Sequence, residues 1–203
     1  MADHRPEPVG ASAGRTAHAL SPAQLLARIA AAPPRCGPVR VVAVDGGAAA
    51  GKSSLAARLA RQLPDSSVLA LDDLLDGWAG QFDYADRLRR ELLEPLSRNR
   101  PGSYRRYDWT AGRFAERVPV PVSETLIVEG VSAIFGCAEL ASVRLFLQLP
   151  RAIRERRWID RDGPLQPDWI GWLDAEDRFF AAHPTPSDTI VLGPDDVIER
   201  LPD

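Results

Sequence analysis

The residues with the clearest chemical potential stand in one glycine-rich segment, Gly46-Gly-Ala-Ala-Ala-Gly51-Lys52-Ser53-Ser54. The spacing matches G-x-x-x-x-G-K-[ST], in which small residues let backbone N–H groups surround a phosphate without clashes from Cβ atoms. In such a loop the lysine reaches the β- and γ-phosphates, and the following hydroxyl binds Mg²⁺. The residues expected to bind the nucleotide are Gly46, Gly47, Ala48, Ala49, Ala50, Gly51, Lys52, Ser53 and Ser54.

Lys52 is the one lysine among 25 basic residues, and we expect it to be catalytic. The alternative interpretation is a glycine-rich turn that contains an incidental Lys-Ser pair. A short apolar strand before the segment and a helical pattern after it favour the phosphate loop. GTPases read their base with N-K-x-D, which a chain without a second lysine cannot contain, and the L-S-G-G-Q signature of transporter ATPases is absent as well.

Carboxylates follow two further predicted strands. Asp72 and Asp73 come after Ser67–Leu71, and Glu129 closes the apolar run Thr125–Val128. Ligands of open α/β sheets bind outside the carboxyl ends of strands, so these side chains are candidates for chemistry. Asp72 is the preferred general base and a candidate Mg²⁺ ligand together with Ser53 and Glu129. Helix caps, turns or solvated strand ends are the alternatives.

An arginine-rich segment, residues 151–163, is predicted to be a helix followed by a glycine hinge. Arg154, Arg157 and Arg161 are spaced to share one helix face. Guanidinium groups can spread over phosphoryl oxygens during transfer, so we expect a lid over about 151–167 with Arg157 and Arg161 catalytic. The alternative is a solvated helix whose arginines pair with Glu155 and Asp160.

Another segment, rich in aromatic and basic residues, is expected to bind the phosphate acceptor. This insert spans about 97–121 and is interpreted as a small hairpin or an irregular flap. The rings of Tyr107 and Trp109 could stack on a flat acceptor, and Arg113 could bond to it. Trp78 and Tyr84 could form the opposite wall. The alternative is that the rings only pack the insert against the sheet.

The elements around these residues alternate between strand and helix. Strands are expected at 39–44, 67–71, 125–128, 143–149 and 189–192. Helices are expected from Ser21, after Gly51, over 84–93 with Pro95 ending it, and over 151–161 and 168–182. This alternation predicts an α/β fold with a parallel sheet covered by helices on both faces. Residues 1–19 have no apolar periodicity and are expected to be a disordered tail before a single domain, residues 20–203.

Composition excludes several classes of protein. The chain has 203 residues, two cysteines and three histidines, and none of the histidines lies between residues 19 and 182. These counts argue against a disulfide scaffold, most zinc sites and a Ser-His-Asp triad. A net charge of −3 gives no reason to expect nucleic-acid or membrane-surface binding. We expect a cytoplasmic protein, and we leave homo-oligomerisation open.

Several motifs together resemble the uridine kinase family, within the phosphoribulokinase/uridine kinase group. They cover residues from about 38 to 192 in the family's order. The matching segments are Gly46–Ser54, Leu71–Asp73, Tyr107–Trp109, Leu126–Gly130, Arg157–Asp162 and Ser187–Val191. The Tyr-Asp-aromatic segment before the Val-Glu-Gly strand end is the more specific of them.

This resemblance implies a P-loop NTPase fold, with a five-stranded parallel sheet of order 2-3-1-4-5. It also implies ATP- and Mg²⁺-dependent phosphorylation of a ribose 5′-hydroxyl. Asp72 matches the family's general base, Tyr107 a nucleoside-contacting tyrosine, and Arg157 and Arg161 the lid arginines. The family's histidine after Tyr-Asp-Phe is replaced here by Thr110–Gly112, and its aromatic pair after the base by Leu74 and Leu75.

The expected function is therefore a small-molecule kinase, with uridine and cytidine as first candidate acceptors. A kinase of another hydroxyl substrate, such as a sugar, a vitamin precursor or a drug, is the second candidate. The third is a nucleotide-binding regulatory module without turnover.

Overall fold

The computed structural model describes residues 20–193, so the expected tail, 1–19, lies outside the described residues. Its centre is a five-stranded sheet in which all paired strands are parallel. The strands are β1 (Arg40–Gly46), β2 (Ser66–Ala70), β5 (Thr125–Glu129), β6 (Ala141–Leu147) and β7 (Ile190–Leu192). Their order in the sheet is β2-β5-β1-β6-β7. When only these five strands are numbered along the chain, this order reads 2-3-1-4-5, so the predicted topology is confirmed.

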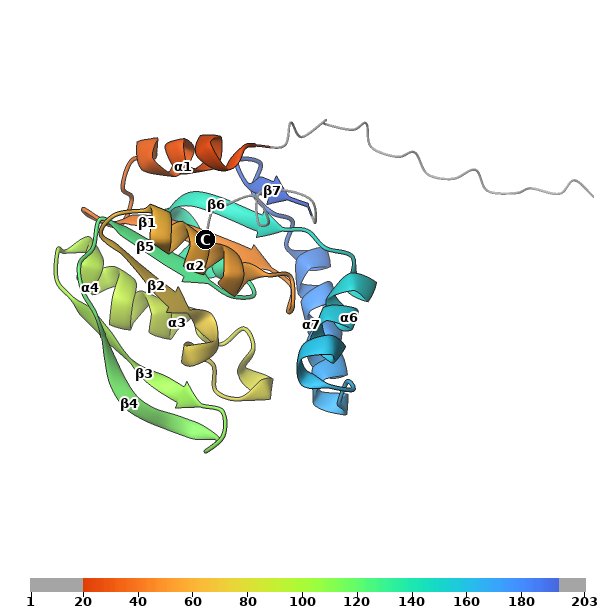
Figure 1. Ribbon diagram of the computed structural model, residues 1–203. Helices are drawn as coiled ribbons and strands as arrows, with labels where there is room; N and C mark the ends of the chain where they lie inside the picture. Colours follow the sequence, from red (N-terminus) through yellow and green to blue (C-terminus); the bar gives the residue numbers. More distant parts are fainter. Residues whose placement is uncertain (1–19, 194–203) are drawn as a thin grey trace, which may run out of the picture.

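Alternate residues of β1 face two separate apolar cores. Val42 and Val44 pack with α1 (Pro22–Ala31) and α2 (Lys52–Gln62) on one face of the sheet. Val41 and Ala43 pack on the other face with the remaining helices and the insert. Every residue from Val41 to Gly46 is buried, as expected for the middle strand of a parallel sheet covered on both sides. Figure 1 shows α1 and α2 together on the upper side of the sheet.

The predicted helix over residues 84–93 is longer and less regular than expected. It consists of α3 (Ala85–Arg87), a π-helical segment (Leu88–Leu93) and α4 (Glu94–Ser97). Pro95 therefore does not end the helix, and that expectation was wrong. Pro95 lies directly after the π-helical segment, where the hydrogen bonding of the helix changes its spacing.

The insert forms an antiparallel hairpin, which is the first of the two expected alternatives. Its strands are β3 (Gly102–Asp108) and β4 (Arg113–Val120), and they pair only with each other. Tyr104 and Val120 are buried in the core on this side, so the hairpin is packed against the domain. Figure 1 shows it beside α3 and α4, on the side of the sheet away from α1.

Two further helices, α6 (Arg151–Asp162) and α7 (Pro167–Ala182), run side by side beyond the carboxyl ends of the strands (Figure 1). Gly163, between them, has a φ of 90° that favours glycine. The remaining helices are α5 (Ala133–Cys137) and three short 3₁₀ segments, Leu71–Leu74, Trp78–Gly80 and Ala138–Leu140. Within residues 20–193, no helix has the length and apolar character needed to cross a membrane.

Candidate active site

The candidate site lies where three parallel strands end. β1 runs into the glycine-rich loop, β2 into the Leu71–Leu74 turn, and β5 into Gly130. Because β2 and β1 flank β5 in the same direction, Lys52, Asp72 and Glu129 come to one edge of the sheet. The three side chains line a single cavity there.

The loop has the backbone conformation that its small residues allow. Gly46 has a φ of 137°, and a Cβ there would lie 2.6 Å from the carbonyl oxygen of Leu147. Ala49 and Gly51 also have positive φ angles, of 59° and 100°. Helix α2 starts immediately afterwards, and no side chain in the described part of the chain caps it. Its first amides are thus available to an anion, as in a phosphate-binding loop.

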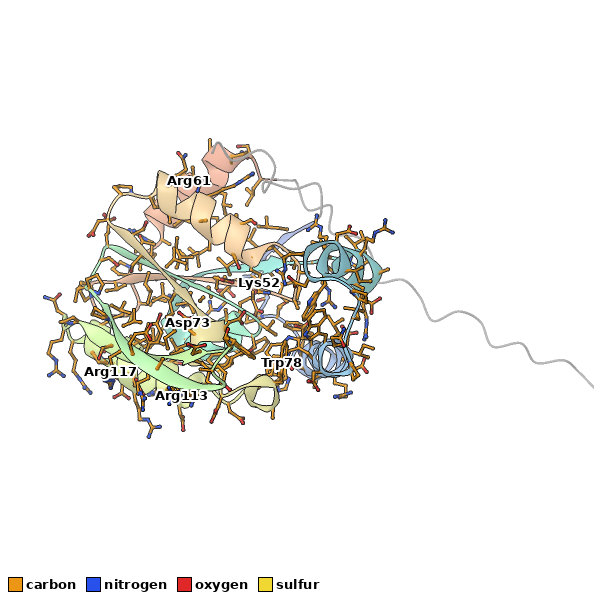
Figure 2. The ribbon with its side chains drawn as sticks, turned by 60° about the horizontal axis from the view of Figure 1, so that its bottom comes forward. Lys52, Arg61, Asp73, Trp78, Arg113 and Arg117 are labelled. Atoms are coloured by element: carbon orange, nitrogen blue, oxygen red, sulfur yellow. The ribbon has the colours of Figure 1, made fainter. Side chains whose placement is uncertain are left out.

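Lys52 is held inside this loop. Its side chain is buried, and Nζ donates a hydrogen bond of 2.9 Å to the carbonyl oxygen of Gly47. Figure 2 shows it at the end of α2 nearest α6 and α7, while Arg61 occupies the other end of α2. A lone ammonium group among backbone dipoles is well placed to attract a polyphosphate.

Ser53 and Glu129 form the expected pair of oxygen donors. The Ser53 hydroxyl donates to Glu129 Oε1 at 2.9 Å. Burial raises the pKa of Glu129, while the charge of Lys52 and the Ser53 hydrogen bond act to lower it. A hydroxyl and a carboxylate are hard donors that suit Mg²⁺. Across residues 20–193, no three or more acidic, histidine or cysteine side chains gather to hold a metal ion by themselves.

The two adjacent aspartates have different surroundings. Asp73 Oδ2 accepts a 2.8 Å hydrogen bond from the hydroxyl of Tyr104 and so helps to hold the hairpin. Asp72 lines the cavity, and its side chain keeps access to solvent there although protein surrounds it. This partial burial raises the pKa of Asp72, while Lys52 and Arg161 act to lower it. Of the two, Asp72 has the position that a general base needs.

The cavity has a volume of about 370 Å³. One part of its wall is the glycine-rich loop with Ser53, Glu129 and Val131. The α6 helix contributes Arg161 and Asp162. The rest is aromatic and comes from Trp78, Trp109, Trp158, Trp169 and Trp172.

The predicted acceptor-binding residues are only partly brought to this cavity. Trp109 lines it, at the tip of the hairpin, and its indole Nε1 donates to the backbone oxygen of Asp72 at 3.2 Å. Tyr107 is buried behind it and packs edge-on against Trp109, with ring centroids 5.2 Å apart. Arg113 is exposed at the start of β4, away from Lys52 (Figure 2), and does not line the cavity.

Of the two residues expected to form an opposite wall, Trp78 lines the cavity but lies beside Trp109, with ring centroids 5.1 Å apart, and Tyr84 does not line it. Trp78 is 43% exposed and lies against α7, where its ring meets that of Trp172 at 5.5 Å. Tyr84 is fully buried in the core, and its hydroxyl bonds with Ser132 at 2.8 Å. A tyrosine at the start of an amphipathic helix can lie in a cavity wall or in the core, so sequence spacing could not distinguish these two positions.

The three arginines expected to share a face of α6 have different partners. Arg157 is exposed, and its Nη1 lies 3.5 Å from the backbone oxygen of Ala50 in the loop. Arg161 lines the cavity and bonds to Asp162 at 2.6 and 2.8 Å. Arg154 is buried and pairs with Glu176 at 2.7 Å. Two of the three thus reach the loop or the cavity, whereas Arg154 joins α6 to α7.

Glu176 is a residue of this site that the sequence did not indicate. Its side chain has no solvent exposure, and its carboxylate accepts hydrogen bonds from Arg154 Nη1, Trp172 Nε1 and the backbone N–H of Ala48. Burial raises its pKa, and Lys52, the Ala48 amide and Arg154 oppose that effect. The carboxylate therefore fixes the glycine-rich loop to both α6 and α7. No local motif could reveal it, because Ala48 and Glu176 are 128 residues apart.

We expect Glu176→Gln to weaken this junction. The amide keeps the shape of the side chain but removes the charge opposite the buried Arg154 guanidinium, which then has only Asp177. The free energy of unfolding should fall by about 1–3 kcal/mol, measured by urea denaturation. The KM for ATP should rise as well, because Ala48 is held less firmly. Asp168→Asn, exposed in the first turn of the same helix, is the control. Equal denaturation midpoints for Glu176→Gln and wild type would contradict this role.

Asp45 is the second residue that the sequence analysis missed. It is buried at the end of β1, and its carboxylate accepts hydrogen bonds from the backbone N–H groups of Gly46, Ser132 and Ile134 at 2.6 to 3.1 Å. Burial raises its pKa to about 6, against the opposing effect of these bonds and of Lys52. Asp45 thus ties the start of the glycine-rich loop to the turn after β5. An aspartate directly between an apolar strand and the loop was the available signal.

Comparison with known proteins agrees with this architecture. No protein-family model matches the chain. Uridine-cytidine kinase C of Dictyostelium discoideum is 34% identical over 108 residues, which cover 48% of this chain and 24% of that protein. The chain thus spans about a quarter of the length of this curated relative.

A solved structure described as a possible uridine kinase from Bacillus stearothermophilus has a TM-score of 0.63 to this chain. The match covers 84% of this chain and 96% of that one at 19% identity, so it bears on the fold alone. The resemblance that the motifs predict is confirmed by the curated relative, and the predicted architecture by the solved structure. The chain has the parallel α/β fold of that solved structure, with strand order β2-β5-β1-β6-β7, and its sequence resembles a uridine-cytidine kinase.

Proposed function

We propose that this protein is an ATP- and Mg²⁺-dependent kinase that transfers the γ-phosphoryl group to a hydroxyl of a small molecule. The observation that carries the proposal is the meeting of Lys52, Asp72 and the Ser53–Glu129 pair at one cavity. This set contains a phosphate-binding cation, a base and the donors for a divalent ion. Uridine and cytidine are the first acceptors to test, because the curated relative is named for them.

In this proposal the glycine-rich loop binds the triphosphate, and Lys52 exchanges its bond to the Gly47 carbonyl for phosphate oxygens. Asp72 accepts the proton of the acceptor hydroxyl as the hydroxyl oxygen attacks the γ-phosphorus. The bond between that phosphorus and the β–γ bridging oxygen breaks, and ADP leaves. The surrounding protein raises the pKa of Asp72, which makes it a stronger proton acceptor than an aspartate surrounded only by water.

Magnesium fits the donors present. Ser53 and Glu129 would hold the ion next to the loop, where it would neutralise charge on the phosphates. Arg161, at the cavity wall, and Arg157, beside the loop, are the cations that would stabilise charge on the transferred group.

We expect Arg157→Ala to lower kcat by about tenfold or more, because a guanidinium at the rim of the loop is lost. Arg156→Ala is the matched control, since that exposed neighbour pairs with Asp160 on the outer side of the same helix. Steady-state kinetics with magnesium-ATP give the comparison. A loss below twofold for Arg157→Ala, or equal losses in both variants, would count against the lid.

The function is tested by incubating the protein with magnesium-ATP and a panel of hydroxyl compounds that includes uridine, cytidine and ribose. Acceptor-stimulated ADP release, with a phosphorylated product detected by mass spectrometry, is the expected result. ATP binding without stimulation by any acceptor would instead favour a nucleotide-binding regulatory module.

A further inference from the structure

All five tryptophans of the chain line the candidate active-site cavity. They come from four separate places in the fold: Trp78 from the segment after β2, Trp109 from the hairpin tip, Trp158 from α6, and Trp169 and Trp172 from α7. The cavity that holds Lys52 and Asp72 therefore has walls built largely of indole rings.

The rings form two groups. Trp78 lies edge-on to both Trp109 and Trp172, with centroids 5.1 and 5.5 Å apart. Trp158 and Trp169 stack at 5.3 Å with 27° between their planes. Trp78 and Trp109 remain 43% and 37% exposed, although large apolar side chains are normally covered. Exposed rings on a concave wall are typical of a site that a ligand covers.

Few polar side chains of the cavity remain free to form hydrogen bonds with an acceptor molecule. Lys52, Ser53, Asp72 and Glu129 are assigned to phosphoryl transfer, and Arg161 and Asp162 pair with each other. Among the lining residues described, none is an asparagine, a glutamine, a histidine or a threonine. A pyrimidine base carries several polar atoms on its edge and would lose hydrogen bonds to water here.

The indole N–H groups complete this count. Trp109 Nε1 donates to Asp72, and Trp172 Nε1 donates to Glu176. Trp158 is 5% exposed, and its Nε1 has no hydrogen-bond partner among the described residues. That nitrogen is itself covered by protein, so three of the five indole N–H groups in the wall offer a ligand no hydrogen bond.

We infer that the acceptor is an alcohol carried by a flat aromatic ring system with few polar atoms, rather than a free pyrimidine nucleoside. This inference rests on the proposed kinase function and specifies its substrate class. The ring would lie among the tryptophans, and its hydroxyl would point to Asp72. The transfer is the one written above: the hydroxyl proton goes to Asp72, the oxygen–phosphorus bond forms, and ADP leaves.

Three probes test this inference: 2-naphthylmethanol as the aromatic alcohol, uridine as the nucleoside and ribose as a sugar. We expect ADP release from magnesium-ATP to show a kcat/KM at least tenfold higher for 2-naphthylmethanol than for either of the others. We also expect 2-naphthylmethanol to quench the intrinsic tryptophan fluorescence in the absence of nucleotide.

Variants connect that preference to the cavity. Two variants, Trp109→Ala and Trp78→Ala, each remove one half-exposed ring from the cavity wall. We expect each to raise the KM for 2-naphthylmethanol at least tenfold and to leave the Kd for ATP unchanged. Phe180→Ala, a ring of α7 that packs on Phe146 and Phe179 outside the cavity, is the control and should leave that KM within twofold.

The outcomes separate the inference from the function on which it rests. Turnover of uridine or ribose in preference to 2-naphthylmethanol, or a KM unaffected by both tryptophan variants, overturns the inference and leaves the kinase function standing. Phosphorylation of another compound of the hydroxyl panel, and not of 2-naphthylmethanol, likewise overturns the inference alone. ADP release with none of the three probes and no compound of that panel, in protein that still binds ATP, overturns the kinase function and the inference with it.

Discussion

Lys52→Ala is expected to abolish phosphoryl transfer, with kcat/KM for ATP at least about a thousandfold below wild type. The ammonium group is buried at the loop and bonds to the Gly47 carbonyl. No other lysine exists in the chain to replace it. Its removal leaves the developing negative charge on the phosphates without its nearest cation. Coupled measurement of ADP release gives the rate.

The controls for this variant use the same helix. Arg61→Ala, at the exposed end of α2 (Figure 2), should retain wild-type rates. Lys52→Arg keeps the charge but not the shape that fits the loop, so we expect it to recover only part of the loss. Wild-type turnover in Lys52→Ala would refute the assignment of the glycine-rich loop to ATP.

Asp72→Asn is expected to lower kcat by about 10²- to 10⁴-fold while ATP binding stays near wild type. The amide retains the size of the side chain but cannot accept the proton of the attacking hydroxyl. Asp76→Asn, an exposed aspartate four positions further along the same segment, is the matched control. A kcat in Asp72→Asn within threefold of wild type would exclude this residue as the base.

The pH profile gives a second test of Asp72. Its folded-state pKa is raised above the ordinary carboxyl value, mainly by burial. Because the base must be ionised to act, kcat/KM should fall as the pH falls through that raised pKa, at a higher pH than for an aspartate with an ordinary pKa. The residual activity of Asp72→Asn should lack this acidic limb. An identical limb in the variant would show that another group titrates.

The sheet was predictable because each strand carries a local signal. Runs such as Val41–Val44 and Leu126–Val128 are apolar on both faces, which is typical of parallel strands buried between helices. The alternation of these runs with helical patterns indicated the fold class, and the family resemblance implied the strand order. The π-helical segment Leu88–Leu93 had no comparable signal, so the end of that helix was placed wrongly at Pro95.

The candidate site was predictable where its chemistry follows the chain. The loop with Lys52 and Ser53 is one continuous motif, and Asp72 and Glu129 each follow a strand. The contacts of Glu176 depend on how α7 packs against the loop, over a separation of 128 residues. The different partners of Arg154 and Arg157 arise in the same way, since α7 covers only one of them. The gathering of five tryptophans is likewise a property of tertiary packing.

Calorimetric titration of the folded protein with magnesium-ATP tests the central claim most directly, since everything else depends on a triphosphate bound at the glycine-rich loop. The account predicts saturable heat with one nucleotide per chain in wild type and a loss of that heat in Lys52→Ala. Absence of heat from wild type with any magnesium nucleotide, or equal heats from wild type and Lys52→Ala, would contradict it.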